Sequence, residues 1–174
     1  MLILVSGGSG SGKSEFAESL VVSSGLSERV YLATMQVWDE ESVRRVERHR
    51  QMRAGKGFAT LECPTGLDRL EVPAHSAVLL EDLSNLSANE YFAPQGGGKA
   101  AFDRVLAGIE QVAARAELLV VVTNELFSDG VRYDPETAAY LELLADLNRA
   151  IAAQADQVYE VVCGIPVAWK EAKT

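Results

Sequence analysis

Gly7-Gly8-Ser9-Gly10-Ser11-Gly12-Lys13-Ser14 decides the fold, because it has the form glycine, four residues, then Gly-Lys-Ser. The apolar run at 2–5 predicts a buried strand before it, and residues 15–20 predict the start of a helix after it. A strand, such a loop and a helix in this order form a phosphate-binding site. Glycines let backbone N–H groups surround phosphate oxygens, and the helix N-terminus adds partial positive charge. We therefore expect the loop Gly7–Ser14 to bind a nucleoside triphosphate.

Two side chains of the loop have expected roles in phosphate chemistry. Lys13 would reach the β- and γ-phosphates, and the Ser14 hydroxyl would bind Mg²⁺. A second metal-binding element is expected at the end of another strand. The apolar run at 77–80 is followed by Glu81 and Asp82, and Glu81 is the preferred metal-side residue. The alternative is a pair of carboxylates in solvent at a strand end.

Apolar runs alternate with helical patterns along the chain, which predicts a single α/β domain with a mainly parallel sheet flanked by helices. The fold class expected is that of the P-loop NTPases. Strands are predicted at 2–6, 30–34, 77–81, 118–123 and 157–162, with a further short strand at 58–62. Helices are predicted at 13–24, 39–53, 84–91, 99–114 and 135–155. The apolar stripe of the last helix is interpreted as core.

Composition limits the function classes. The 174 residues carry a net charge of −9, which argues against a general nucleic-acid or anionic-membrane surface. No apolar run approaches the length of about 18 residues that predicts a membrane-spanning helix, and no signal peptide is visible. Cys63 and Cys163 have no metal-ligand spacing. We expect them to be buried, reduced thiols in a cytoplasmic protein.

A cluster of basic residues follows the second predicted strand. His49 lies among Arg44, Arg45, Arg48, Arg50 and Arg53. One interpretation is a solvated helix face that pairs with nearby acidic residues. The other is chemical: a neutral imidazole can attack phosphorus, and the arginines would stabilise charge on the phosphoryl group and on a pyrophosphate leaving group. His75, in a loop before a strand, is interpreted as structural.

Seven segments, taken together and in this order, resemble one known family. They are Gly7–Ser14, Tyr31-Leu32-Ala33-Thr34-Met35-Gln36, Arg45-Val46-Glu47-Arg48-His49-Arg50, Thr60-Leu61-Glu62, Leu79-Leu80-Glu81-Asp82-Leu83, Val121-Val122-Thr123-Asn124-Glu125 and Val162-Cys163-Gly164-Ile165-Pro166. The chain is similar over nearly its whole length to the bifunctional adenosylcobinamide kinase / adenosylcobinamide-phosphate guanylyltransferase family of cobalamin biosynthesis.

The resemblance implies a RecA-like fold, a homotrimer with active sites near subunit interfaces, and two reactions. ATP or GTP would phosphorylate the aminopropanol hydroxyl of adenosylcobinamide. His49 would then take the guanylyl group of GTP, release pyrophosphate and pass the group to adenosylcobinamide phosphate. Lys13 and His49 are the implied catalytic residues. Nucleotide contacts are implied for the phosphate loop and for Thr34, Met35, Gln36, Arg50, Gln51, Met52, Arg53, Glu62 and Glu81.

Two other functions fit parts of the sequence. A small-molecule kinase without a covalent histidine would use Lys13, Ser14 and Glu81 and leave His49 idle. A nucleotide-dependent switch or motor would give no small-molecule product. A guanine-specific switch needs an Asn-Lys-x-Asp element, which Thr123-Asn124-Glu125-Leu126 does not match, and a motor needs more chain than 174 residues provide.

Overall fold

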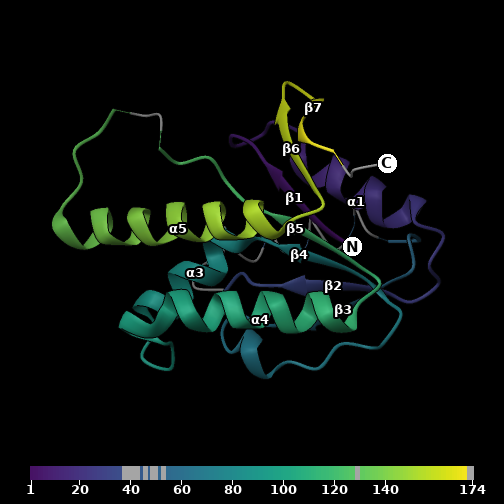
Figure 1. The fold of residues 1–174 in the computed structure, drawn as a ribbon, viewed down its shortest axis with the longest axis horizontal. Helices are drawn as coiled ribbons and strands as arrows, with labels where there is room; N and C mark the ends of the chain where they lie inside the picture. The colour runs from purple at the N-terminus through teal and green to yellow at the C-terminus, as the bar shows by residue number, and fades with distance from the viewer. Residues whose placement is uncertain (37–43, 45–46, 48–50, 52–53, 128–129, 172–174) are drawn as a thin grey trace.

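A seven-stranded sheet in the order β3-β2-β4-β5-β1-β6-β7 forms the centre of the computed structural model (Figure 1). The structure describes residues 1–36, 44, 47, 51, 54–127 and 130–171. β1 to β6 pair in parallel, and β7 pairs antiparallel with β6. The mainly parallel α/β sheet expected from the sequence is confirmed.

The strands agree with the predicted ranges within one residue at either end. They are β1 Leu2–Ser6, β2 Arg29–Ala33, β3 Phe58–Glu62, β4 Ala77–Glu81, β5 Leu118–Val122 and β6 Gln157–Val162. β7, Ile165–Lys170, was not predicted. Its Pro166 weakens a strand pattern, but β7 is the sheet's last strand, where a missing N–H donor is tolerated.

Four predicted helices are confirmed with small shifts at their ends. They are α1 Lys13–Ser23, α3 Leu83–Phe92, α4 Ala101–Arg115 and α5 Pro135–Gln154, with short 3-10 helices η1 at Leu67–Arg69 and η2 at Gly98–Ala100. The helix predicted at 39–53 lies largely outside the described residues. No described helix combines the length and the apolar content that crossing a bilayer requires.

Helices cover both faces of the sheet, which explains why β4 and β5 are continuous apolar runs. One core cluster joins Ala17 and Val21 of α1 to one face of the central strands. The other joins the buried faces of α3, α4 and α5 to the opposite face. From α5 it includes Leu144, Leu147 and Ile151, so the stripe interpreted as core from the sequence is buried there.

The two cysteines differ in environment. Cys63 is buried, as expected, directly after β3. Cys163 is exposed, so the expectation of a buried thiol was wrong for this residue. The reason is the unpredicted β7: Cys163 lies in the tight turn between β6 and β7 and has a φ of 50°. Its side chain therefore projects from a hairpin end.

Candidate active site

The phosphate loop connects β1 to α1 and is closely packed. The N–H of Ser11 donates to the carbonyl of Gly8 at 3.2 Å, and Gly12 caps α1 with a φ of 92°. A Cβ on Gly7 would lie 2.6 Å from Ser11 Oγ and 2.7 Å from the carbonyl oxygen of Val161. Only glycine fits at that position, so the sequence of the loop is determined by close approach as well as by backbone conformation.

Lys13 is folded back over the loop. Its Nζ donates a hydrogen bond to the carbonyl of Gly8 at 3.0 Å, and the residue is 8% exposed. Burial lowers the pKa of Lys13, and the negative charges of Asp82 and Glu81 oppose this effect. A buried ammonium with one carbonyl partner is poised to exchange that partner for a phosphate oxygen.

Ser14, the last residue of the phosphate loop, is in contact with Glu81. The Ser14 hydroxyl donates a hydrogen bond to Oε1 of Glu81, and Glu81 is 8% exposed. α1 supplies the serine from its first turn, and the carboxyl end of β4 supplies the glutamate. A hydroxyl and a carboxylate side by side next to a phosphate-binding loop are hard oxygen ligands, the type that Mg²⁺ prefers.

Asp82, the other candidate of the carboxylate pair, is occupied within the protein. It is the N-cap of α3, and its carboxylate accepts hydrogen bonds from Ser84 Oγ at 2.5 Å, Asn85 N at 2.7 Å and Asn85 Nδ2 at 3.1 Å. A fourth comes from Asn124 Nδ2 at 3.0 Å. The geometry thus favours Glu81 over Asp82 on the metal side.

Thr34 ties the ends of β2 and β4 together. Its N–H donates to the carbonyl of Glu81 at 3.2 Å, and its hydroxyl contacts the backbone of Asp82, accepting from N at 2.7 Å and lying 2.9 Å from O. Asn89 Nδ2 donates to the carbonyl of Thr34 at 2.8 Å. Thr34 is 1% exposed, so its side chain serves this junction.

The remaining described candidates lie at the same edge of the sheet or near it. Met35 and Gln36 follow Thr34 directly and are half-buried, and Gln36 Oε1 is buried without a hydrogen-bond partner among the described residues. Glu62 is exposed at the end of β3. Ala33 of β2 pairs with Glu62 of β3 on one side and with Glu81 of β4 on the other. The two glutamates are therefore separated by one strand, a distance of about 10 Å.

The basic cluster is only partly described. Gln51 is helical and exposed, and its Nε2 donates to Glu47 Oε1 at 3.3 Å. Arg44 is exposed. The expected nucleophile His49 lies outside the described residues, and so do the expected nucleotide contacts Arg50, Met52 and Arg53 and the basic residues Arg45 and Arg48.

Two elements of the site, Asn124 and Gly164, were given no role by the sequence analysis. The turn of the β6–β7 hairpin packs against the phosphate loop: the N–H of Gly164 donates to the carbonyl of Ser11 at 2.8 Å, and a Cβ on Gly12 would lie 3.2 Å from Gly164 Cα. Asn124, after β5, donates to Asp82 and to Ser84. Polar residues directly after the buried run 118–122 were the available signal for Asn124.

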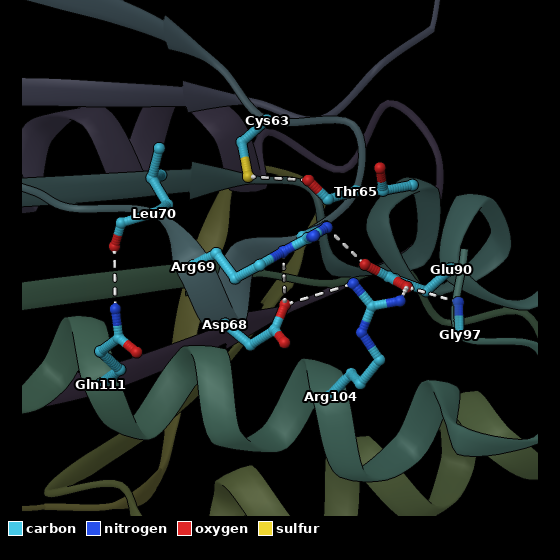
Figure 2. Close-up of polar contacts among 10 residues, drawn as sticks. Cys63, Thr65, Asp68, Arg69, Leu70, Glu90, Gly97, Arg104 and Gln111 are labelled. Atoms are coloured by element: carbon cyan, nitrogen blue, oxygen red, sulfur yellow. Dashed lines mark hydrogen bonds and ion pairs between the residues drawn. The ribbon is translucent and has the colours of Figure 1, made fainter. Parts of the chain in front are cut away.

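A buried carboxylate fixes the segment that follows Glu62. Figure 2 shows Glu90, which is 1% exposed, between three groups. Its Oε1 accepts from Gly66 N at 2.5 Å, and its Oε2 accepts from Gly97 N at 2.8 Å and pairs with Arg104 Nη1 at 3.2 Å. Arg104 also contacts Asp68 at 3.4 Å. The cluster joins η1, α3 and α4, and it thereby holds the chain that follows β3 in place.

Comparisons with known proteins give a consistent assignment. The family described as "Cobinamide kinase / cobinamide phosphate guanyltransferase" matches residues 3–169. The "Bifunctional adenosylcobalamin biosynthesis protein CobU" of Escherichia coli is 34% identical, and its namesake from Salmonella typhimurium 32%, each over 96% of this chain and 98% of the relative. The "Bifunctional adenosylcobalamin biosynthesis protein CobP" of Pseudomonas aeruginosa is 32% identical over 96% of both chains.

Solved structures agree on the fold. The flagellar accessory protein FlaH from Methanocaldococcus jannaschii superposes with a TM-score of 0.54 at 14% identity, covering 98% of this chain and 78% of that one. The RadB recombinase gives 0.50 at 16% identity, covering 91% of this chain and 73% of that one. At these identities the likeness concerns the fold alone, and the fold is that of the P-loop NTPases expected from the sequence.

Proposed function

The chain belongs to the cobinamide kinase / cobinamide phosphate guanyltransferase family and is therefore an enzyme of phosphoryl and guanylyl transfer, and we propose that it carries out both steps on adenosylcobinamide. ATP or GTP donates a phosphoryl group to the aminopropanol hydroxyl. GTP then donates a guanylyl group to the new phosphate, which gives adenosyl-GDP-cobinamide and pyrophosphate. The observation that carries the proposal is the family match over residues 3–169.

In the first step the hydroxyl oxygen attacks the γ-phosphorus, and the bond to the β–γ bridging oxygen breaks. Lys13 is placed to stabilise the charge that develops, because its Nζ lies over the loop that would hold the phosphates. The backbone N–H groups of the loop and the N-terminus of α1 add to this stabilisation.

In the second step a nitrogen of His49 attacks the α-phosphorus of GTP, and pyrophosphate leaves with the electron pair of the broken bond. The substrate phosphate then takes the guanylyl group from His49. The composition of the segment supports this step, because five of the ten residues at 44–53 are arginines in a chain with a net charge of −9. The nucleotide-binding residues that we propose are Gly7, Gly8, Ser9, Gly10, Ser11, Gly12, Lys13, Ser14, Thr34, Met35, Gln36, Arg50, Gln51, Met52, Arg53, Glu62 and Glu81.

We propose Mg²⁺ as the cofactor, held by Ser14 and Glu81. The hydrogen bond between the Ser14 hydroxyl and Oε1 of Glu81 supports it, because it brings two oxygen ligands together beside the phosphate loop. Bound there, Mg²⁺ would neutralise charge on the phosphate oxygens. Glu81 would contact the ion directly or through its waters.

We also propose a homotrimer and a cytoplasmic location. The homotrimer is supported by four exposed apolar side chains on one face of the β6–β7 hairpin, which are Val162, Ile165, Val167 and Trp169. Trp169 is 70% exposed and Ile165 is 66% exposed. The cytoplasmic location is supported by the use of nucleoside triphosphates in both steps. Sedimentation of the wild type and of Trp169→Glu tests the assembly, and a monomeric wild type would reject it.

Labelling with GTP tests the covalent step. Wild-type protein incubated with GTP labelled on the α-phosphate should acquire a label that is stable in alkali and released in acid. His49→Ala should acquire none. His75→Ala is the matched control, because His75 is exposed and contacts only Glu117, at 3.7 Å, among the described residues. Absence of label on the wild type would leave a simple kinase as the function.

A further inference from the structure

Asn124 lies close to both Asp82 and the start of the phosphate loop. It follows β5, whose neighbours in the sheet are β4, ending in Glu81, and β1, leading into the phosphate loop. The N–H of the next residue, Glu125, donates to the carbonyl of Gly7 at 3.1 Å. Asn124 is therefore anchored to the first residue of the loop through the backbone.

The hydrogen bonds around Asn124 determine which way its amide points. Nδ2 lies 3.0 Å from Asp82 Oδ2 and 2.6 Å from Ser84 Oγ. The single hydroxyl hydrogen of Ser84 is donated to Asp82 Oδ1, at 2.5 Å, so Ser84 Oγ can only accept. The carboxylate of Asp82 also only accepts. If the amide were reversed, its oxygen would face two acceptors, so Nδ2 must occupy that position.

This orientation leaves the amide oxygen as an available acceptor. Both hydrogens of Nδ2 are used, and Oδ1 has no hydrogen-bond partner among the described residues. Oδ1 diverges from Nδ2 and therefore points away from Asp82 and Ser84, the partners that α3 provides. The side chain is only half-buried, so a ligand can reach it.

The surrounding contacts hold this acceptor rigidly. Tyr140 of α5 donates from its hydroxyl to the carbonyl of Ser84 at 2.9 Å, and Thr123 donates to Asn148 Oδ1 at 2.9 Å. Thr123 is 1% exposed. Ser84, a hydrogen-bond partner of Asn124, and Thr123, its neighbour in the chain, are thus each tied to α5 by a partly buried hydrogen bond, and this limits the movement of Asn124.

We propose that Oδ1 of Asn124 accepts a hydrogen bond from the substrate hydroxyl and aims its oxygen at the γ-phosphorus; this inference rests on the proposed function. The O–P bond forms as the bond to the β–γ bridging oxygen breaks, and the nucleoside diphosphate leaves with the electron pair. The hydroxyl proton passes to an oxygen of the transferred phosphoryl group, because an amide cannot hold it. Guanylyl transfer involves no free hydroxyl and does not need Asn124.

The two transfers separate this role from a structural one. With γ-labelled ATP and adenosylcobinamide, Asn124→Ala should phosphorylate about ten- to a hundredfold more slowly than wild type. With GTP and adenosylcobinamide phosphate supplied directly, the same variant should transfer the guanylyl group at the wild-type rate. The rise in melting temperature caused by ATP should also persist. Asn124→Ser should show the same separation if Asn124→Ala does not fold.

Gln111→Ala is the matched control. It removes another side-chain amide, which donates to the carbonyl of Leu70 at 3.0 Å and is exposed, and it leaves Asn124 and its neighbours unchanged, so both transfers should continue at wild-type rates. Equal phosphorylation by Asn124→Ala and wild type would overturn the inference, and so would a parallel fall of both transfers. A wild type that phosphorylates no adenosylcobinamide would instead reject the proposed function.

Discussion

The hydroxyl of Ser14 donates a hydrogen bond to Oε1 of Glu81 across a separation of 67 residues in the sequence. One residue comes from the first turn of α1 and the other from the last position of β4. The pair joins the phosphate loop to the end of β4, which β5 separates from β1 in the sheet, and a metal ion held by the pair would be coordinated by both residues.

Glu81→Gln should therefore raise the Mg²⁺ concentration needed for half-maximal phosphorylation and lower kcat at least about tenfold, because an amide is a weaker ligand than a carboxylate. A Mg²⁺ titration of the kinase reaction measures both effects. Glu15→Gln is the control: Glu15 lies one residue beyond Ser14 and is exposed. Equal Mg²⁺ dependence in both variants would contradict the assignment.

Lys13→Met should abolish phosphorylation without destabilising the nucleotide-free protein. Burial lowers the pKa of Lys13, so the folded protein binds fewer protons there than the unfolded chain between the two pKa values. The cost of the buried charge is present at pH 7 and declines as pH rises through the folded-state pKa. Lys13→Met removes this cost.

Thermal unfolding without nucleotide, at pH 7 and at pH 10, is the measurement. The melting temperature of Lys13→Met should equal or exceed that of the wild type at pH 7, and the difference should shrink at pH 10. ATP should stabilise the wild type and not the variant. A variant that melts well below the wild type at pH 7 would show that the ammonium stabilises the fold.

Glu90→Ala should lower the free energy of unfolding by about 3 kcal/mol, because it removes a buried partner of Arg104 and leaves two backbone N–H groups unpaired. Glu71→Ala is the matched control. The pair of Glu71 with Arg115 is exposed and 3.9 Å long, and its loss should change the free energy by less than about 1 kcal/mol. Urea unfolding of both variants measures these free energies of unfolding. Equal decreases in the two variants would contradict the role of Glu90.

The two thiols should react at very different rates. Burial raises the pKa of Cys63 to about 11, helped by the negative charges of Glu90 and Asp68, so this thiol stays protonated at pH 8. Cys163 is exposed. Iodoacetamide at pH 8 should modify Cys163 rapidly and Cys63 only after unfolding, which peptide mass spectrometry would show. Rapid modification of Cys63 in the folded protein would contradict its burial.

Local features of the site were predictable because they are encoded in consecutive residues. The loop Gly7–Ser14 and the choice of Glu81 depend on one strand end each, and both lie together in the structure. The turn at Gly164 and the contact of Asn124 with Asp82 were not predictable. They depend on β5 lying between β4 and β1, and on β6 lying beyond β1, and periodicity does not encode strand order.

The proline of β7 illustrates the same limit. Pro166 reads as a break in the pattern, since a central strand cannot lose a donor. Only the position of β7 at the edge of the sheet makes this residue compatible with a strand. The burial of Cys163 was predicted wrongly for the same reason, because its exposure follows from the hairpin that β7 completes.

During synthesis of the chain, the contact between Gly164 and Ser11 can form only after Gly164 has been added. The phosphate loop is synthesised before Gly164, whose N–H donates to the carbonyl of Ser11 and which lies 153 residues after Ser11 in the sequence. The N–H of Leu2 likewise has no such partner until Asp156 has been synthesised, since it donates to Asp156 Oδ2 at 2.7 Å. A nascent chain that ends before β6 therefore holds its phosphate loop without these two hydrogen bonds.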